Sequence, residues 1–336
     1  MAQCVTGAAL DVLPDPPTGA LTSVDVYISS QCNRRCTYCF LPADFFTSGK
    51  RMSITSFSGI VSWSKRHDVK EITLLGGEPS LHPSFAEMVR IASNNEMDVR
   101  VVTNGARRFR RLLADGALAA KDLALVAVSL DCLDPAVQDE FRGPGAWQDA
   151  MATIELLRKH AVIFDINVTA VKPVLAGMET LIDFAHEVGC RRVNIHWPST
   201  IGIGTTLDPG AVPDRGEWLE LTRWVERRVE RRSDFYVEIE RGYLADHEQL
   251  AGCALADFSN LQILPDGRAY RCGLLVDQDE MASLAMTGDQ LRLTGPGHGE
   301  ERLRADWLSS CDSCPVMRAD GRRACIYDKV SSVRPR

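Results

Sequence analysis

The stretch VDVYISSQCNRRCTYC, residues 24–39, joins a β-rich run to three closely spaced cysteines. Cys32, Cys36 and Cys39 lie in one eight-residue loop that contains no histidine. A structural zinc site normally takes four protein ligands, often two cysteine pairs or a mixture with histidine. Three thiolates can instead hold three corners of a 4Fe-4S cluster and leave the fourth iron open to a non-protein ligand. The loop therefore indicates such a cluster, with a zinc loop completed by a distant cysteine as the alternative.

Around this loop the chain alternates six β-rich runs with longer amphipathic segments, up to about residue 197. Apolar residues recur in the longer segments at three- and four-residue spacing, which is typical of helices. Strict alternation of strand and helix predicts a parallel sheet with right-handed crossovers. Six units predict an α/β fold, a partial (β/α)6 TIM barrel, with functional groups at the carboxyl ends of the strands. Strands are expected at residues 24–29, 71–76, 98–104, 123–131, 164–171 and 192–197, and helices at 53–67, 83–95, 134–143, 146–160 and 178–189.

The composition of the 336-residue chain is that of an ordinary globular protein, with 45% hydrophobic and 25% charged residues. No apolar run is long enough to span a bilayer, and the first residues lack the features of a secretion signal. We therefore expect a cytoplasmic protein that does not bind membranes. The net charge of −7 does not favour nucleic acid, and the basic clusters at 107–111 and 223–232 are expected to be solvated helix faces. Eleven cysteines without a secretion signal favour reduced thiols over disulfides.

The composition changes after a Gly- and Pro-rich connection at residues 201–216 and one further expected helix at 217–232. From about residue 235 the chain predicts short strands, including a hairpin in LQILPDGRAYRC, residues 261–272, with its turn at Pro-Asp-Gly. Five of the eleven cysteines fall in this part. The expected organisation is a lead-in at residues 1–22, the barrel at 23–212, and a linker helix with a cysteine-rich extension at 213–336.

Several motifs at the predicted barrel mouth, taken with the cysteine loop, resemble those of the radical S-adenosylmethionine (SAM) enzymes. In that family the amino and carboxylate groups of SAM chelate the open iron. GGEP, residues 76–79, resembles the family's site for the SAM amino group, since glycines let the backbone approach a ligand and Glu78 can accept hydrogen bonds from an ammonium. TNG at 103–105 and SLD at 129–131 end strands where the family contacts the ribose and carboxylate of SAM.

Two further residues complete this implied SAM site. Arg142 has forked donors suited to the SAM carboxylate, and Tyr38 occupies the aromatic position that packs near adenine in the family, although it also suits the core. The resemblance therefore implies SAM contacts by Tyr38, Gly76, Gly77, Glu78, Asn104, Ser129, Asp131 and Arg142.

The cysteines of the tail resemble the SPASM and twitch extensions that hold auxiliary iron–sulfur clusters in this family. A hairpin turn at Gly267 would bring two of them together, and a CxxC motif supplies a close pair. With five cysteines for four positions, the tail predicts one auxiliary 4Fe-4S cluster, and a zinc ribbon is the alternative. The candidate ligands are Cys253, Cys272, Cys311, Cys314 and Cys325.

Three other residues are candidates for contact with the substrate. Cys132 follows SLD where the family commonly has Gly, so it is a possible hydrogen-atom donor, or simply a small residue in a tolerant loop. His196 and Ser199, at and just after the end of the sixth strand, are expected to bind substrate. Because His196 and Trp197 alternate along a strand, at most one of them should face inward.

The resemblance implies an enzyme that reductively cleaves SAM to a 5'-deoxyadenosyl radical, which removes a hydrogen atom from its substrate. We expect a small polar natural-product intermediate, such as a sugar, aminocyclitol or nucleoside, as in antibiotic biosynthesis. Dehydrogenation, epimerisation or decarboxylation would follow, with flavodoxin or ferredoxin as electron donor. The alternative is a peptide- or protein-modifying maturase. It is ranked second because many peptide modifiers carry a leader-binding domain, and only about twenty residues precede the first strand here. A non-catalytic metal-binding protein is the remote alternative.

Overall fold

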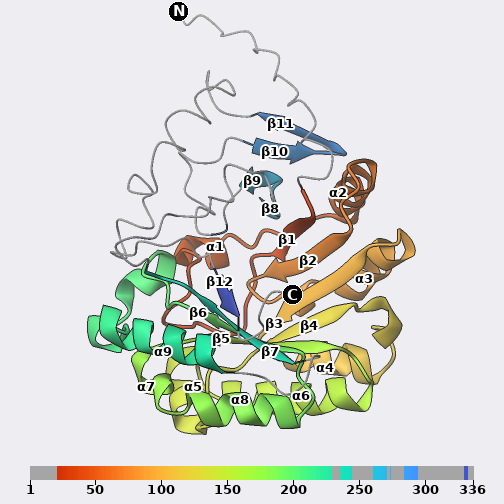
Figure 1. Cartoon of the computed structure of the whole chain (residues 1–336). Helices are drawn as coiled ribbons and strands as arrows, with labels where there is room; N and C mark the ends of the chain where they lie inside the picture. The colour runs from red at the N-terminus through yellow and green to blue at the C-terminus, as the bar shows by residue number, and fades with distance from the viewer. Residues whose placement is uncertain are drawn as a thin grey trace, which may run out of the picture.

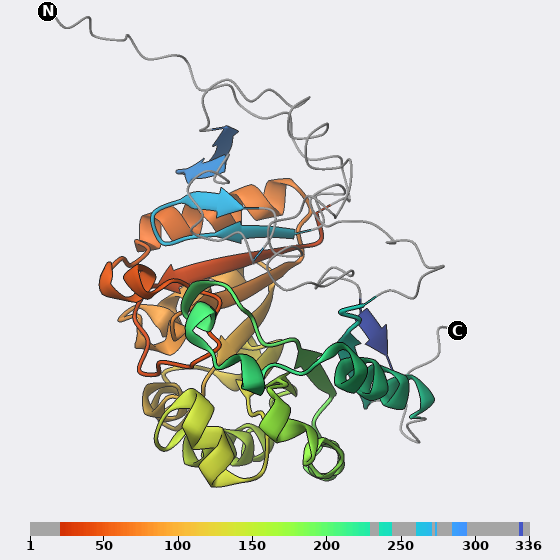
Figure 2. The same ribbon diagram turned by 90° about the vertical axis from the view of Figure 1, so that its left-hand side faces the viewer.

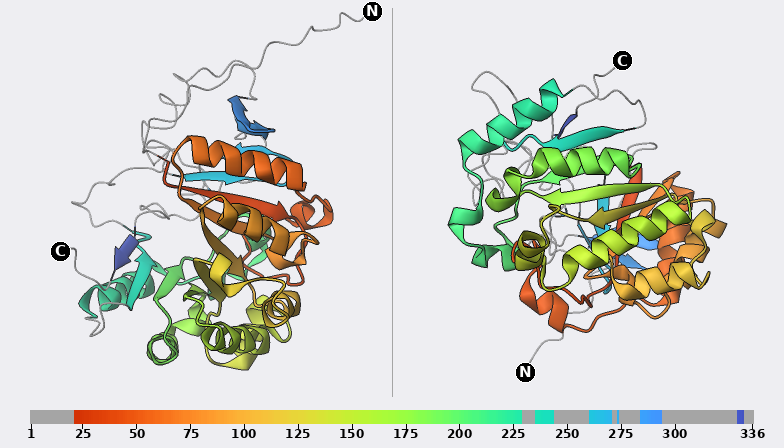
Figure 3. Two further views of the ribbon diagram at one scale, coloured as in Figure 1. Left: turned by 90° about the vertical axis from the view of Figure 1, so that its right-hand side faces the viewer. Right: turned by 90° about the horizontal axis from the view of Figure 1, so that it is seen from below.

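The computed structural model describes residues 21–228, 235–243, 260–270, 273, 284–293 and 329–331. Within these residues the strands form one sheet, in the order β11-β10-β9-β8-β1-β2-β3-β4-β5-β6-β7-β12. Helices run around the outside of this sheet from α2 to α9 (Figures 1 and 3). None of the described helices has the length and apolar character needed to cross a membrane.

The six predicted strands are confirmed, and they pair in parallel in chain order. Each is followed by one or more helices, which is the partial TIM-barrel arrangement predicted from the alternating pattern. The strands are β1 (Ser23–Ser29), β2 (Glu71–Gly76), β3 (Asp98–Thr103), β4 (Leu125–Ser129), β5 (Phe164–Thr169) and β6 (Arg192–His196). The longer helices between and after them are α2 (Ile54–Arg66), α3 (Phe85–Asn94), α4 (Arg107–Ala114), α5 (Pro135–Arg142), α6 (Ala146–Lys159), α8 (Met178–Glu187) and α9 (Arg215–Arg227). Short elements are α1 (Ala43–Thr47), α7 (Lys172–Leu175), η1 (Pro79–Leu81), η2 (Ala120–Asp122), η3 (Gly202–Thr206) and η4 (Pro209–Ala211).

The main core lies between the sheet and the surrounding helices. In β1, Val24, Val26 and Ile28 are fully buried in this core, whereas the alternate residues Asp25 and Tyr27 line a cavity on the inner side. This is the two-residue period of a strand, with one set of side chains for packing and the other for the interior. The inner face of the barrel is therefore available for polar groups.

Helix starts are set by local chemistry. The Asp134 side chain accepts a hydrogen bond from the Ala136 amide, and Pro135 occupies the first turn of α5. Asp214 and Glu217 form a reciprocal capping box at α9. Helix α4 carries the basic cluster 107–111 with an exposed face, as predicted.

The sheet continues beyond the six predicted strands at both edges. Strand β7 (Tyr236–Glu240) pairs in parallel with β6, and β12 (Lys329–Ser331) adds to it in antiparallel fashion. At the other edge β8 (Asn260–Ile263) pairs in parallel with β1, and β9 (Arg268–Tyr270), β10 (Leu284–Thr287) and β11 (Gln290–Leu293) follow in antiparallel order. Figure 2 shows β8 and β9 beside β1. The domain boundaries proposed from composition stay predictions, but one sheet includes strands from both sides of residue 212.

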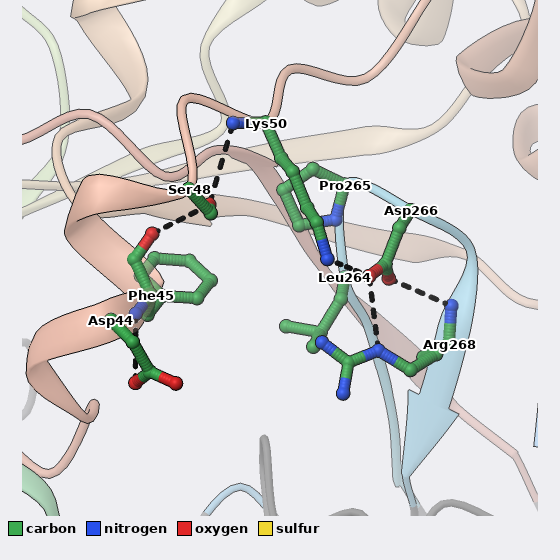
Figure 4. Close-up of a pocket in the computed structure, with 8 residues that line it drawn as sticks. All are labelled: Asp44, Phe45, Ser48, Lys50, Leu264, Pro265, Asp266 and Arg268. Atoms are coloured by element: carbon green, nitrogen blue, oxygen red, sulfur yellow. Dashed lines mark hydrogen bonds and ion pairs between the residues drawn. The ribbon is translucent and has the colours of Figure 1, made fainter.

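The predicted hairpin at residues 261–272 is confirmed by β8 and β9, whose turn contains Gly267 at a φ of +88°. Its Asp266 accepts hydrogen bonds from Lys50 at 2.8 Å and from Arg268 at 3.0 Å (Figure 4). Burial alone would raise the pKa of Asp266, but the Lys50 hydrogen bond and the Arg268 charge outweigh it and lower that pKa. The hairpin is thereby fastened to the loop between β1 and α2.

Candidate active site

A cavity of about 400 Å³ opens at the carboxyl ends of the strands, where the sequence predicts the functional groups. Eleven of the predicted site residues line it: Cys32, Cys36, Tyr38, Cys39, Gly76, Gly77, Asn104, Ser129, Arg142, His196 and Ser199. Glu78, Asp131 and Cys132 are not among its lining residues. Lining residues that sequence reasoning missed include Asp25, Arg34, Asn167, Thr169, Glu240 and Gln262.

The three cysteines of the loop sit together at one side of this cavity as half-buried free thiols. A backbone hydrogen bond from the Cys39 amide to the Cys36 carbonyl, 3.2 Å long, closes the turn between the last two. Burial raises the pKa of Cys32 to about 11 and that of Cys39 to about 12, and it raises the pKa of Cys36 as well. Ligation by a metal therefore has to displace a proton from each thiol.

The donor set fits an iron–sulfur cluster. Among the residues that the structure describes, no three His, Cys, Asp or Glu side chains are grouped so as to hold a single metal ion. In a 4Fe-4S cluster each thiolate binds a different iron, so three thiols spaced around a common cavity match its demands.

The two glycines of GGEP lie directly against the cysteine loop. The Gly77 amide donates to the Ser29 carbonyl at 2.9 Å, and the next amide, of Glu78, donates to the Gln31 carbonyl at 2.7 Å. A Cβ atom on Gly77 would lie 2.5 Å from the Gln31 carbonyl oxygen and 2.7 Å from the Cβ of Cys32. These glycines are therefore required for close packing against the cysteine loop as well as for any approach of a ligand.

The side chain of Glu78 makes several hydrogen bonds within the protein. Its side chain is fully buried and accepts hydrogen bonds from Thr103 Oγ1 at 2.9 Å, from the Asn104 amide at 2.8 Å and from the hydroxyl and amide of Ser80. Burial raises the pKa of this carboxyl, against the lowering effect of those hydrogen bonds. Glu78 thus joins the GGEP turn to the TNG turn, and its predicted contact with the SAM amino group stays a prediction.

Arg142 and Asp131 also interact mainly with each other. The Nε and one Nη of Arg142 donate to the two oxygens of Asp131, each at 2.7 Å. The guanidinium donors expected to bind the SAM carboxylate therefore bind Asp131 in this structure. Tyr38 donates its hydroxyl to Asp131, stacks on Phe141 and lies under the Arg142 guanidinium. Asp131 also accepts a bond from the Thr169 amide at 2.7 Å. This buried cluster holds α5 against the cysteine loop, and it gives Tyr38 a core position beside the cavity.

Cys132 is buried and is not among the residues that line the cavity, and its predicted role as a hydrogen-atom donor stays a prediction. Its thiol is buried in the hydrophobic core and donates a weak hydrogen bond to the Asp134 carbonyl at 3.5 Å. Burial raises its pKa to about 11. The alternative interpretation, a small residue that the loop tolerates, agrees with this position.

The two predicted substrate residues, His196 and Ser199, also line the cavity. His196 Nδ1 is 2.9 Å from Glu240 Oε1, and His196 Nε2 is 2.7 Å from the side-chain nitrogen Nδ2 of Asn194. Ser199, at 9% exposure, lines the same cavity. Trp197 is among the lining residues too, but it belongs to the buried core and its ring packs edge-on against Trp218 and Tyr243. The expectation that at most one of His196 and Trp197 faces inward stays a prediction.

The tail cysteines cannot be compared with the structure in the same way. Cys253, Cys272, Cys311, Cys314 and Cys325 all lie outside the described residues. The auxiliary cluster and its zinc alternative therefore stay predictions.

A model of the radical SAM superfamily matches residues 26–195, which include the cysteine loop and the GGEP, TNG and SLD motifs. The chain belongs to the radical SAM superfamily. Membership implies SAM and a 4Fe-4S cluster as cofactors. The assignment of the three loop cysteines as the ligands of that cluster stays a prediction.

The relatives of this radical SAM chain carry names that describe different reactions. It is 26% identical over 175 residues to a probable GTP 3',8-cyclase of Methanococcus aeolicus, covering 50% of this chain and 57% of the relative. It is also 26% identical over 296 residues to the mycofactocin maturase MftC of Mycobacterium ulcerans, covering 84% of this chain and 77% of the relative. The chain thus spans little more than half the length of the first of these.

Among solved structures, SuiB of Streptococcus suis bound to the precursor peptide SuiA resembles it with a TM-score of 0.61. The sequences are 18% identical, and the match covers 80% of this chain and 62% of SuiB. At this identity the likeness supports the fold alone.

Proposed function

We propose that this radical SAM protein is an enzyme that removes a hydrogen atom from a residue of a peptide or protein substrate. When bound, the cluster and SAM supply the 5'-deoxyadenosyl radical that such a reaction needs. Of the two substrate classes considered from the sequence, the named relatives favour the peptide class over sugars and aminocyclitols, because a maturase aligns over 84% of the chain.

The observation in this chain that carries the proposal is the chemistry of the cavity's described walls. Two arginines line it, and each is already paired with a carboxylate, Arg34 with Asp149 and Arg142 with Asp131. A nucleoside triphosphate needs several cations at its phosphates. Within the part of the chain that the structure describes, neither arginine is available for that purpose, which weighs against a GTP-like substrate.

Other residues that line the cavity have groups that suit a peptide instead. Asn167 and Ser199 offer amide and hydroxyl donors and acceptors, and a peptide backbone presents one N–H and one C=O per residue. Strand β5 holds Asn167 on the sheet, so its side chain offers the substrate a contact at a fixed place. Leu41, Phe46 and Leu75 supply apolar surface in the same cavity.

A labelling experiment tests the proposal. Anaerobically reconstituted enzyme is incubated with SAM, dithionite and candidate peptides carrying deuterated side chains, and 5'-deoxyadenosine is examined for deuterium by mass spectrometry. We expect label from a peptide with the wild type, and no 5'-deoxyadenosine above background with Cys36→Ala, since that variant lacks a cluster ligand.

Two outcomes would contradict it. If deuterium came from labelled GTP or a sugar and from no peptide, the substrate would be a small molecule and not a peptide. If iron-loaded wild type formed no 5'-deoxyadenosine under any condition, the protein would not cleave SAM and the proposed radical activity would be wrong.

A further inference from the structure

One carboxylate, Asp149 in the first turn of α6, receives two arginines from different parts of the chain. Arg34 donates to its Oδ2, and Arg110 Nη2 donates to its Oδ1 at 2.8 Å. The exposed fractions of these side chains are 8% for Arg34, 20% for Arg110 and 22% for Asp149. Because the three groups are largely removed from solvent, salt screens their attraction less than it screens a surface pair.

Arg34 connects this carboxylate to the cysteine loop. It lies between the first and second cysteines and also donates to the carbonyls of Gly143 at 3.3 Å and of Pro144, in the turn between α5 and α6. Its own amide donates to the sulfur of Cys32 at 3.4 Å. A displacement of the Arg34 side chain would therefore be passed directly to a cluster ligand.

Arg110 connects the same carboxylate to the TNG turn. Its Nη1 donates to the Asp149 carbonyl at 3.0 Å and to the Gly105 carbonyl. Gly105 has a φ of +80°, and a Cβ there would lie 2.7 Å from the Asp149 carbonyl oxygen. Thr153 donates to that carbonyl as well, at 2.7 Å. The TNG turn thus packs directly on the start of α6, against which α4 also packs (Figure 1).

Asn104 closes the connection back to the cysteine loop. Its side-chain amide donates to Asn33 Oδ1 at 3.0 Å and contacts the sulfur of Cys32 at 3.6 Å. The contacts therefore form a ring that passes from the loop through Arg34, Asp149 and Arg110 to the TNG turn, and returns to the loop. A closed ring of this kind fixes the separation of two segments more firmly than a single contact does.

We propose that Asp149 is a positioning residue that sets the place of the cysteine loop relative to the TNG turn, and so controls SAM affinity and the environment of the cluster. Its negative charge attracts both guanidinium groups and offsets the repulsion between them. The proposal follows from membership of the radical SAM superfamily and does not depend on the peptide substrate.

The test compares Asp149→Asn with a matched control, Asp165→Asn. Asp165 is also a buried carboxylate that holds two arginines, Arg191 at 2.7 Å and Arg192 at 2.9 Å, but it lies near the amino end of β5, away from the cavity. Both reconstituted variants are measured for iron content, thermal stability, SAM dissociation constant without substrate, and the electron paramagnetic resonance spectrum of the reduced cluster with and without SAM.

We expect both substitutions to lower thermal stability, since each leaves two arginines without their shared carboxylate. Only Asp149→Asn should weaken SAM binding, by about tenfold or more, and alter the spectrum. Unchanged SAM affinity and an unchanged spectrum in Asp149→Asn, or equal changes in Asp165→Asn, would show that Asp149 contributes to stability only.

A second variant covers the case in which Asp149→Asn yields no folded protein. Arg110→Gln keeps the Asp149–Arg34 pair and opens the ring at the TNG side only. Weaker SAM binding in this variant supports the proposal, and wild-type binding contradicts it. Because SAM binding is measured without any substrate, a wrong substrate class in the proposed function does not affect the result.

Discussion

Single buried polar residues hold the segments after β2 together, and His82, which follows η1, is one of them. At 4% exposure, its Nε2 lies 3.0 Å from the Met52 carbonyl and its Nδ1 lies 3.1 Å from the Ser84 amide, which donates to it. A neutral imidazole satisfies both contacts, with the proton on Nε2. Protonation at Nδ1 would remove the acceptor, so this site requires a neutral histidine.

This requirement predicts a pH effect on stability. Burial lowers the pKa of His82 below its ordinary value, with the charges of Arg51 and Arg108 adding to the effect. The unfolded chain therefore takes up a proton below about pH 6.5 while the folded chain resists it. Stability should fall as the pH drops through that value, until the folded state is protonated too.

The measurement is the free energy of unfolding of wild type and His82→Gln at pH values above and below about 6.5. The variant should be less stable at the higher pH because Gln cannot reproduce both contacts, but it should lose less stability on acidification. Identical pH dependence in the two proteins would show that His82 does not contribute.

At the scale of elements, the turn after β2 and the loop after β1 are fitted to one another without spare space. A Cβ on Gly77 would come within 2.5 Å of the Gln31 carbonyl oxygen. Backbone atoms on both sides cannot rotate away as a long side chain can. The position of the cysteine loop thus depends on a residue 45 positions further along the chain than its first cysteine.

Gly77→Ala is therefore expected to displace the cysteine loop. It should cost about 1–3 kcal/mol of stability, as overpacking does, and reduce the iron retained after reconstitution. The matched control is Gly177→Ala, where the nearest heavy atom to a new Cβ is the Val174 carbonyl oxygen at 3.8 Å. The control should keep wild-type iron and stability, and a Gly77→Ala protein that does the same would disprove the close-fit argument.

At the scale of the whole molecule, the two edges of the sheet contribute to one cavity. Glu240 at the end of β7 and Gln262 in β8 both line it, although β7 and β8 lie on opposite sides of the barrel strands. Segments beyond the six predicted strands therefore belong to the wall of the site. The described strands that follow the six predicted ones thus help to shape the cavity.

The tail cysteines predict a second cluster, which a metal count can test. Reconstituted wild type should contain about eight irons, for two 4Fe-4S clusters. Replacing Cys253 and Cys272 by Ala should reduce this to about four while SAM binding persists, since the first cluster has its own three ligands. Zinc in the tail, or about four irons in the wild type, would contradict the auxiliary cluster.

The sequence by itself determined the order of the six strands and the helices between them, since these follow from local periodicity and turn residues. It also determined the cysteine loop and the motifs at the strand ends, which residue spacing alone identifies. Only the tertiary structure decided which side chains reach the cavity. Glu78 and Cys132 turn into the protein, because side-chain direction beyond a strand end depends on the turn that follows and on its packing.

Ion pairs and strand pairings between distant parts of the chain could not be predicted from the sequence, for a related reason. Arg34 and Asp149 are 115 positions apart, and Arg110 and Asp149 are 39 apart. No local pattern indicates that one carboxylate will receive both arginines, or that β7 and β8 will extend the sheet at opposite edges. Such contacts exist only once the barrel has brought the ends of distant strands to one mouth. The sequence therefore carried the chemistry of this protein, and the fold arranged it in space.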